Sequence, residues 1–170
     1  KNMYDYYTVG FLYNKGYVDS IRGAFRIQCQ DPNILEYIKQ VLGKGSIHGD
    51  ILRIYDKDIA DKVSYYRGLD VAAIPPEEFC NFVRGYFDAH GCVYVRQDKY
   101  AQVTMTLRRD FAYYIQNILI FNGIESIVKP LKSSFQLTVS KRVAIEKFKA
   151  FIYRDSVCRM ERKYSRLFSV

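Results

Sequence analysis

The chain has 170 residues and 49% apolar composition, enough for one ordinary domain or two small halves with a buried core, which excludes a disordered chain. Its net charge of +8 favours polyanionic partners, nucleic acid first and an anionic membrane surface second. The longest apolar stretch, from Phe111 to Phe121, is shorter than the roughly 20 residues that a membrane-spanning helix needs, so no membrane span is expected.

The N-terminal part of the chain predicts the order helix, strand, strand, helix, strand, strand, helix. The first helix is expected to run up to about Lys15, with Gly16 as its stop. Further on, Phe25, Ile27 and Cys29 alternate with polar residues, which is typical of a half-buried antiparallel strand. The other predicted elements are a strand at 17–21, a helix at 32–42 capped by Asp31, two strands around a turn at 49–50, and a helix at 56–69.

The same order returns after residues 70–78, which are expected to be a linker because Pro75 and Pro76 cannot sit inside a helix. A helix from about Pro76 is expected to end at His90, just before Gly91. The other predicted elements are strands around a turn at 98–99, a helix at 111–121 capped by Asp110, a hairpin that turns at 131–134, a helix at 140–155 and a charged helical tail at 158–168.

This repetition predicts an α+β fold of two pseudo-symmetric αββαββα repeats. Gly10 and Gly85 are 75 residues apart, and "EYIKQVL" aligns with "YYIQNIL" at a shift of 77. We expect a first repeat at 1–69, a linker at 70–78 and a second repeat with its tail at 79–170, together one compact pseudo-dimeric domain. Each repeat should form a four-stranded antiparallel sheet with helices on one face, because two packed halves bury more apolar surface than one.

The cysteines and histidines argue against a zinc site. Cys29, Cys80, Cys92 and Cys158 are widely spaced without a C-x-x-C pair, and only two histidines are present. Reduced, buried thiols are expected, in an intracellular protein of the cytoplasm, nucleoid or an organelle. The chain shows no signal-peptide pattern, and because it begins with Lys1 rather than Met, further residues upstream are expected.

Glycine in the middle of two predicted helices indicates a close contact between them. Gly10 and Gly85 each cost roughly 1 kcal/mol relative to alanine, a cost that close approach of two backbones usually offsets. Phe11 and Tyr86 follow these glycines and complete the expected two-helix interface. Helices that cross there bring their C-terminal ends side by side.

The segments "GFLYNKG" and "GYFDAHG", residues 10–16 and 85–91, resemble the two motifs of a single-chain LAGLIDADG homing endonuclease. The resemblance covers nearly the whole chain, including "IPPEEFCNFVRGYFDAHG" and the ending "FIYRDSVCRMERKYSRLF", and the second motif is the stronger match. It implies that the motif helices form the interface of a pseudo-twofold pair and that the two sheets form a saddle over the major groove of double-stranded DNA. It also implies that an acidic residue before each terminal glycine holds the divalent metals that cleave the strands.

The chain departs from that pattern at the acidic positions, where Lys15 and His90 stand as neighbours. A lysine ammonium has no lone pair for a metal, and imidazole suits Zn or Ni better than Mg²⁺, whose ligands are anionic oxygens. We therefore expect no intact catalytic residue and no cofactor, with Mg²⁺ needed only by a residual nuclease. Lys15 and His90 either contact phosphate or have drifted after loss of selection for cutting. Asp88 is a weak metal candidate, more typical of a helix-end or interface residue.

Polar residues on the outward face of the predicted strands are the expected DNA contacts, since arginine suits guanine, glutamine suits adenine and threonine suits base edges or a thymine methyl. They are Arg22, Arg26, Gln28, Gln30, Ser46, His48, Arg53 and Tyr55 in the first repeat, and Tyr94, Arg96, Gln102, Thr104, Thr106, Arg108, Lys129, Lys132, Gln136 and Thr138 in the second. Lys57, Lys141 and Arg142 follow the last strand of each half and are expected to contact phosphates. An ordinary polar sheet face is the alternative, although such a face often balances Glu against Lys.

Four functions stay open at this point. The first is a sequence-specific double-stranded DNA-binding protein without cleavage, a monomer with internal pseudo-twofold symmetry that regulates transcription or a mobile element. The second is an active or residual Mg²⁺-dependent double-strand DNA endonuclease, or an acid-substituted variant of one. The third is a group I intron maturase that binds intron RNA, and the fourth is a structural or protein-binding role.

Overall fold

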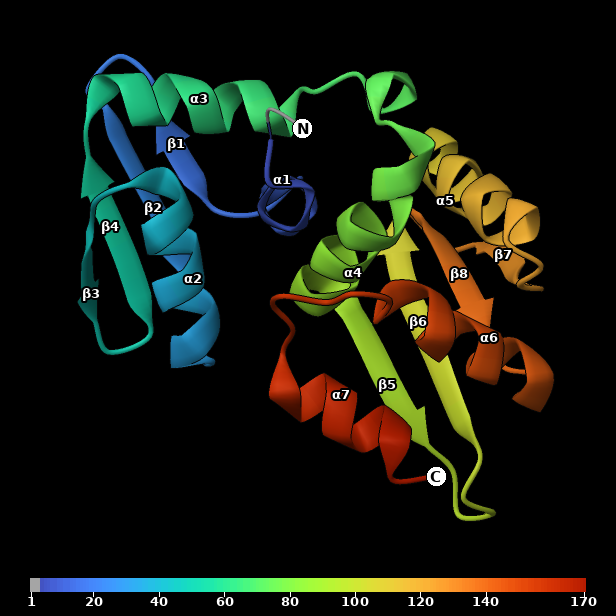
Figure 1. Ribbon diagram of the computed structural model, residues 1–170. Coiled ribbons are helices and arrows are strands. Elements are labelled where there is room, and N and C mark those ends of the chain that lie inside the picture. Colours follow the sequence, from blue (N-terminus) through green and yellow to red (C-terminus); the bar gives the residue numbers. More distant parts are fainter. Residues whose placement is uncertain (1–3) are drawn as a thin grey trace.

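Two four-stranded antiparallel sheets with helices packed on them make up the fold in the computed structural model, which describes residues 4–170 (Figure 1). The predicted α+β class is confirmed. The beginning of the predicted first helix, residues 1–3, lies outside the described residues. In the described part of the chain, no helix is both long enough and apolar enough to cross a membrane.

The elements follow the predicted order in both halves. The first half contains α1 (Tyr6–Leu12), β1 (Tyr17–Asp19), β2 (Ala24–Gln28), α2 (Pro32–Leu42), β3 (Ser46–His48), β4 (Ile51–Tyr55) and α3 (Lys57–Arg67). The second half contains α4 (Phe79–His90), β5 (Gly91–Val95), β6 (Ala101–Leu107), α5 (Arg109–Phe121), β7 (Ile127–Pro130), β8 (Phe135–Val139), α6 (Arg142–Ile152) and α7 (Glu161–Phe168). The first sheet has the order β1-β2-β4-β3 and the second the matching order β5-β6-β8-β7.

Alternation along the strands decides which face of each sheet is buried. Phe25 and Ile27 on β2 point to the helices and are buried, whereas Arg26 and Gln28, which alternate with them, are exposed. In the second sheet, the alternating apolar residues of β6 are likewise buried. One face of each sheet therefore packs on helices, and the other stays open.

The helices α1 and α4 lie between the two sheets (Figure 1) and cross at their glycines. A Cβ atom on Gly10 would overlap the carbonyl oxygen of Phe82, and a Cβ on Gly85 would overlap that of Tyr7. Phe11 and Tyr86 are buried at this crossing. Glycine is thus required at both positions because the two backbones touch.

The first helix is shorter than predicted. It ends at Leu12, and Tyr13 follows with extended backbone angles. Asn14 then adopts a φ of 61° and Gly16 a φ of 87°, both in the left-handed region that asparagine and glycine tolerate best. Lys15 therefore lies in a loop after α1 and not on the helix itself.

The start of α4 also differs from the prediction, because the segment expected as a linker extends up to it. Residues 70–78 contain two short 3₁₀ turns, η1 (Val71–Ala73) and η2 (Pro76–Glu78), with Ile74 buried between them. The α-helix begins only at Phe79, because Pro76 starts the second 3₁₀ turn. The linker is therefore an ordered, packed connection.

Two smaller predictions are wrong. Asp110 does not cap α5, because Arg108 takes the N-cap position without a side-chain bond and Asp110 lies in the first turn. Cys92 is exposed, whereas Cys29, Cys80 and Cys158 are buried as expected. Cys92 pairs with Thr104 on the outward face of the second sheet, which explains its exposure.

Candidate nucleic-acid interface

Arginine and amide side chains lie on the open face of the first sheet. One row across its four strands consists of Tyr17, Arg26, Arg53 and Ser46. The next row consists of Gln28, Ile51 and His48. The Arg26 guanidinium lies 5.0 Å from the ring centroid of Tyr17 and directly opposite Arg53. Like charges placed opposite each other on neighbouring strands repel, so this row favours an anionic partner.

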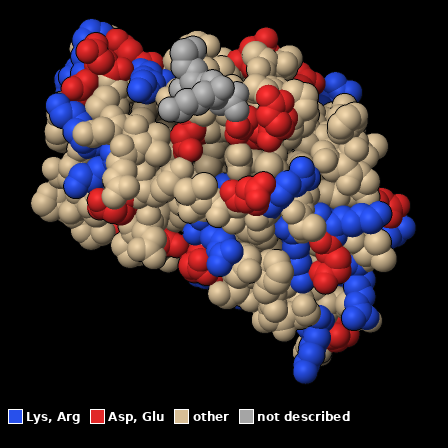
Figure 2. Space-filling model, in the orientation of Figure 1, with Lys and Arg blue, Asp and Glu red and all other residues tan. Residues whose placement is uncertain are grey.

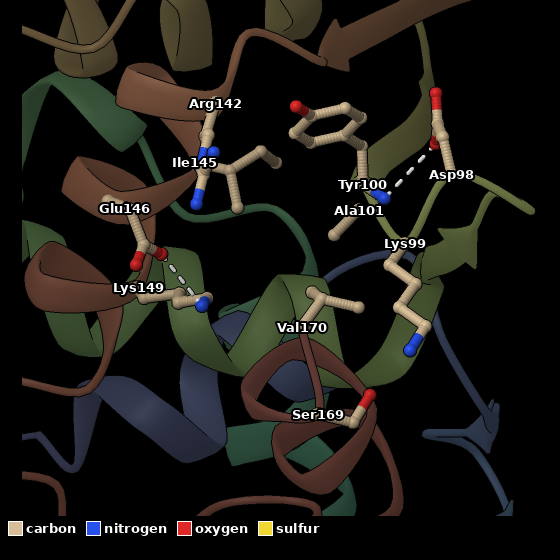
Figure 3. A pocket seen from close by; sticks show the side chains of 10 residues that line it. All are labelled: Asp98, Lys99, Tyr100, Ala101, Arg142, Ile145, Glu146, Lys149, Ser169 and Val170. Carbon is tan, nitrogen blue, oxygen red and sulfur yellow. Dashed lines mark hydrogen bonds and ion pairs between the residues drawn. The ribbon is translucent and has the colours of Figure 1, made fainter.

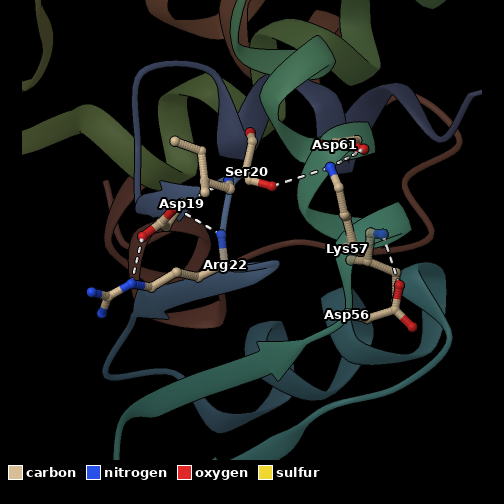
Figure 4. Close-up of polar contacts among 8 residues, drawn as sticks. Asp19, Ser20, Arg22, Asp56, Lys57 and Asp61 are labelled. Atoms are coloured by element: carbon tan, nitrogen blue, oxygen red, sulfur yellow. Dashed lines mark hydrogen bonds and ion pairs between the residues drawn. The ribbon is translucent and has the colours of Figure 1, made fainter.

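The turn between β1 and β2 is held by side chains drawn in Figure 4. The backbone N–H of Arg22 donates to Asp19 Oδ1 over 3.1 Å, and its side chain is 85% exposed. Lys57 Nζ donates to the carbonyl oxygen of Ser20 over 3.3 Å and pairs with Asp61 at the same distance. Arg22 thus projects from a fixed turn, whereas Lys57 serves to attach that turn to α3.

The open face of the second sheet carries glutamine, threonine and lysine. Its rows are Tyr94 and Gln102; Cys92, Thr104, Thr138 and Ile127; and Thr106, Gln136 and Lys129. Exposed residues in the neighbouring turns and strand ends add Arg96, Arg108 and Lys132, and Gln30 and Tyr55 extend the first sheet in the same way. Of these, Arg96 pairs with Asp98 at 3.2 Å. The polar residues predicted from alternation therefore do lie on open sheet faces.

Acidic residues are scarce on these faces. None of the outward strand residues of the second sheet is acidic, and in the first sheet the outward strand residues include only Asp19, which is occupied by its own turn. The helix-covered side differs, because Lys, Arg, Asp and Glu are intermixed there (Figure 2). The positive charge of the molecule is thus least balanced on the open faces.

Two of the predicted phosphate contacts interact with other residues of the protein. Lys141 pairs with Glu125 at 2.9 Å. Arg142 lies over the ring of Tyr100, 5.6 Å from its centroid, in a cavity that the inward-facing residues Ala101 and Ile145 also line (Figure 3). Arg142 therefore lies on the helix-covered side of the second sheet, because the first turn of α6 points it away from the open face.

The structure brings the two motif ends together. His90 Nε2 lies 3.0 Å from the carbonyl oxygen of Tyr13, a distance at which the neutral ring donates its proton to that oxygen. Burial lowers the pKa of His90, and the charges of Lys15 and Lys163 lower it further. At neutral pH His90 is therefore an uncharged helix-end residue, and Lys15 is the cation beside it.

Asp88 belongs to the interior of the helix interface. It is 1% exposed, and its Oδ2 accepts hydrogen bonds from the Tyr7 hydroxyl at 2.7 Å and from the Met160 N–H at 2.8 Å. Burial raises the pKa of this carboxyl, against the effect of these bonds. Asp88 therefore joins α1, α4 and the C-terminal segment.

Lys163 is the site residue that sequence reasoning missed. It lies on α7, is 7% exposed, and donates to the carbonyl oxygens of Phe87 at 2.9 Å and Asp88 at 2.7 Å. Burial lowers its pKa to about 8. The signal for it was the spacing of Met160, Lys163 and Leu167, which places all three on one helix face.

These residues do not fit Mg²⁺, which prefers carboxylate and other oxygen ligands. Neither Lys15 nor His90 offers an anionic oxygen, and the carbonyl oxygens at the end of α4 already accept bonds from the Lys163 ammonium. Across residues 4–170 there is no cluster of three or more His, Cys, Asp or Glu that could hold a metal ion.

Buried Lys163 should make stability depend on pH. Its pKa is about 8 in the folded protein and 10.5 in an ordinary setting, so its charged form is disfavoured by folding. That cost is fully present below pH 8 and vanishes above pH 10.5, so we expect the wild type to gain stability across this interval relative to Lys163→Met. Urea unfolding of both proteins from pH 7 upward measures the difference, from which titrations common to the two proteins cancel. A pH-independent difference would contradict the burial of a charged Lys163.

Comparison with known proteins agrees with this architecture. The family model of the LAGLIDADG-like domain matches residues 77–153. Among curated proteins, no sequence matches the chain significantly.

Several solved structures share the fold across nearly the whole chain. The LAGLIDADG meganuclease I-AabMI bound to uncleaved DNA aligns with a TM-score of 0.68 and 15% identity, over 98% of this chain and 90% of that one. I-DmoI in complex with DNA and Ca aligns with a TM-score of 0.64 and 16% identity, over 87% of each chain. Full-length DUF199/WhiA from Thermatoga maritima aligns with a TM-score of 0.63 and 11% identity over 99% of this chain, which corresponds to 62% of the WhiA length.

The family match covers the second half, and the structural matches extend over both sheets and the central helices. Residues 77–153 are therefore a LAGLIDADG-like domain, and the chain as a whole has the fold of the LAGLIDADG homing endonucleases.

Proposed function

We propose that this chain is a sequence-specific double-stranded DNA-binding protein that has lost strand cleavage and acts inside the cell as a regulator of transcription or of a mobile element. The observation that carries the proposal is the pair of open sheet faces, whose arginine, glutamine and threonine side chains stand in register with almost no acid among them. Such side chains recognise base edges in the major groove. I-AabMI and I-DmoI, which share this fold, were solved with DNA.

Loss of cleavage follows from the chemistry at the motif ends. Metal-assisted cleavage of a phosphodiester needs carboxylates that hold the metal beside the scissile bond. Here Lys15 and His90 take those positions, and the carboxylate of Asp88 is turned inward to Tyr7. The Lys163 ammonium repels a further cation. The same positive groups favour the DNA backbone, so binding is retained.

The test is selection of bound sequences from a random duplex pool with the full chain, in Mg²⁺ and in EDTA. We expect the same preferred site in both conditions and an affinity that falls steeply as salt rises, because several phosphates are neutralised. A supercoiled plasmid that carries the selected site should stay intact. Mg²⁺-dependent double-strand cuts would instead establish the endonuclease, and stronger binding of structured intron RNA than of the duplex would establish a maturase.

The variant with Lys15→Asp and His90→Asp tests whether the exchange of two acids alone explains the loss of cleavage, or whether the rest of the site has also changed. We expect it to bind the selected site more weakly than wild type, roughly tenfold, because one cation is lost and two anions face the DNA. We expect no cleavage in Mg²⁺, since Lys163 still occupies the carbonyl oxygens at the end of α4. Plasmid nicking and filter binding measure both. Restored cutting would show that only the two acids separate this chain from an active nuclease.

A further inference from the structure

A cavity of about 360 Å³ opens where the loop after α1, the end of β2, the end of α4 and the start of α7 meet. Its polar lining consists of Lys15, Gln28, Gln30, Asp88, Arg162 and Lys163. The residues come from both halves of the fold and from the C-terminal helix.

Positive charge in this cavity is not balanced by acid. Lys15, Arg162 and Lys163 converge on it, and Asp88 is the one acidic residue in its lining. Its Oδ2 accepts from the Tyr7 hydroxyl and the Met160 N–H, whereas its buried Oδ1 has no hydrogen-bond partner among the described residues. Within residues 4–170, no carboxylate forms an ion pair with any of the three cations. Burial lowers the pKa of Lys163, Asp88 raises it in part, and the charges of Arg162 and Lys15 lower it again, so the three cations lie close enough to repel one another.

Buried contacts hold the start of α7 and Lys163 in place. Arg84, 2% exposed, donates from Nε to the carbonyl oxygen of Cys158 at 2.7 Å and from Nη1 to that of Ile152 at 2.8 Å. Asp88 then holds the backbone of Met160, directly before α7. Lys163 uses two of its three N–H groups on carbonyl oxygens and keeps one for a ligand. The start of α7 is therefore preorganised.

The cavity adjoins the open face of the first sheet. A second hollow of about 230 Å³ shares Lys15 and Gln28 with it and is lined further by Tyr17 and Arg26. A nucleic-acid backbone that crosses this face can therefore reach the start of α7 without leaving the surface.

We propose that Lys15, Arg162 and Lys163 form a pocket for one phosphodiester of the DNA backbone, which makes α7 part of the DNA interface. The pocket works without a metal ion, since the ammonium groups and the guanidinium supply the charge and the N–H donors. Arg162 is exposed, and its planar guanidinium can bind two phosphate oxygens at once. The proposal rests on the proposed function, because it takes double-stranded DNA as the ligand.

The test compares Arg162→Ala and Lys15→Ala with the matched control Lys62→Ala, which removes one exposed charge from α3. On the selected duplex, each pocket variant should bind roughly tenfold more weakly, and the slope of log affinity against log salt should become shallower by about 1. The control should change neither. Circular dichroism and melting temperature should match wild type for all three proteins.

Duplexes that carry one neutral methylphosphonate at successive central positions then locate the contact. With the methylphosphonate at one of these positions, the wild type should lose as much affinity as Arg162→Ala loses on unmodified DNA. With the methylphosphonate at that same position, Arg162→Ala should lose no further affinity. If the wild type binds the duplex tightly while Arg162→Ala and Lys15→Ala behave like Lys62→Ala, the pocket is refuted and the proposed function stands.

If the wild type binds no duplex above a nonspecific level, the proposed function fails. A melting experiment with inorganic phosphate then tests by itself whether the pocket binds an anion. A rise in melting temperature with phosphate that Arg162→Ala abolishes would support an anion pocket with another source of phosphate. An equal rise in both proteins, or no rise at all, would overturn it.

Discussion

Gly85→Ala is expected to destabilise the fold by about 3 kcal/mol or more. Its Cβ would overlap the carbonyl oxygen of Tyr7 and lie 2.8 Å from the backbone nitrogen of Phe11. Both atoms belong to the backbone of α1, which cannot move aside as a side chain does. The helices α1 and α4 would have to separate, and the buried residues at their crossing would lose contact.

Urea unfolding of Gly85→Ala measures this loss, with Gly68→Ala as the control. Gly68 follows α3 at a φ of −110°, and a Cβ there meets nothing within 4 Å. The control should therefore change stability by less than about 1 kcal/mol. If Gly85→Ala were as stable as the control, the backbones of the two helices would not touch.

Arg26→Ala and Arg53→Ala are each expected to weaken binding to the selected duplex by about 1–3 kcal/mol and to relax the preference at one base pair. The two guanidinium groups lie in register at the centre of the open face of the first sheet. Arginine there suits bidentate bonds to guanine, which alanine cannot make. Folding stability should stay the same or rise slightly, since each change removes a like-charge repulsion.

Selection from the random pool, repeated with each variant, checks the base preference, and filter binding checks the affinity. Lys62→Ala serves again as the control, because it removes the same charge from an exposed position of α3, a helix that packs on the covered face of the first sheet. If the arginine variants only reduced the salt slope and kept the full sequence preference, Arg26 and Arg53 would bind phosphates and not bases.

The open face of the first sheet favours affinity for an anion at the expense of folding stability. In the first sheet the row with Arg26 and Arg53 contains no acid, so its repulsion is a cost in the free protein. A bound polyanion removes that cost and releases counterions. In the pocket at α7, Lys15 and Lys163 likewise repel each other in the free protein, and a bound phosphate would remove that cost.

Sequence periodicity predicted the strands well because it reports burial directly. Phe25 and Ile27 alternate with Arg26 and Gln28, and the structure buries the first pair and exposes the second. Boundaries were predicted less well. The end of α1 depends on the left-handed backbone of Asn14, which a helical pattern does not reveal.

The candidate site was only partly predictable for a related reason. Outward strand residues follow from alternation, but the roles of Lys57 and Lys141 in ion pairs depend on partners in other elements. Arg142 was expected at the DNA and lies on the helix-covered side, because the direction of the first turn of α6 is set by packing. These placements require the tertiary structure.

Local patterns of residue types were enough to predict the repeat, the α+β class, the faces of the strands and the two glycines of the helix crossing. The bonds by which Lys163 caps the end of α4 and Asp88 holds Met160 become visible only in the folded chain. These bonds join residues 72 to 76 positions apart, and no local pattern specifies which buried donor meets which acceptor across that separation. The packing of α7 against α4 makes that choice.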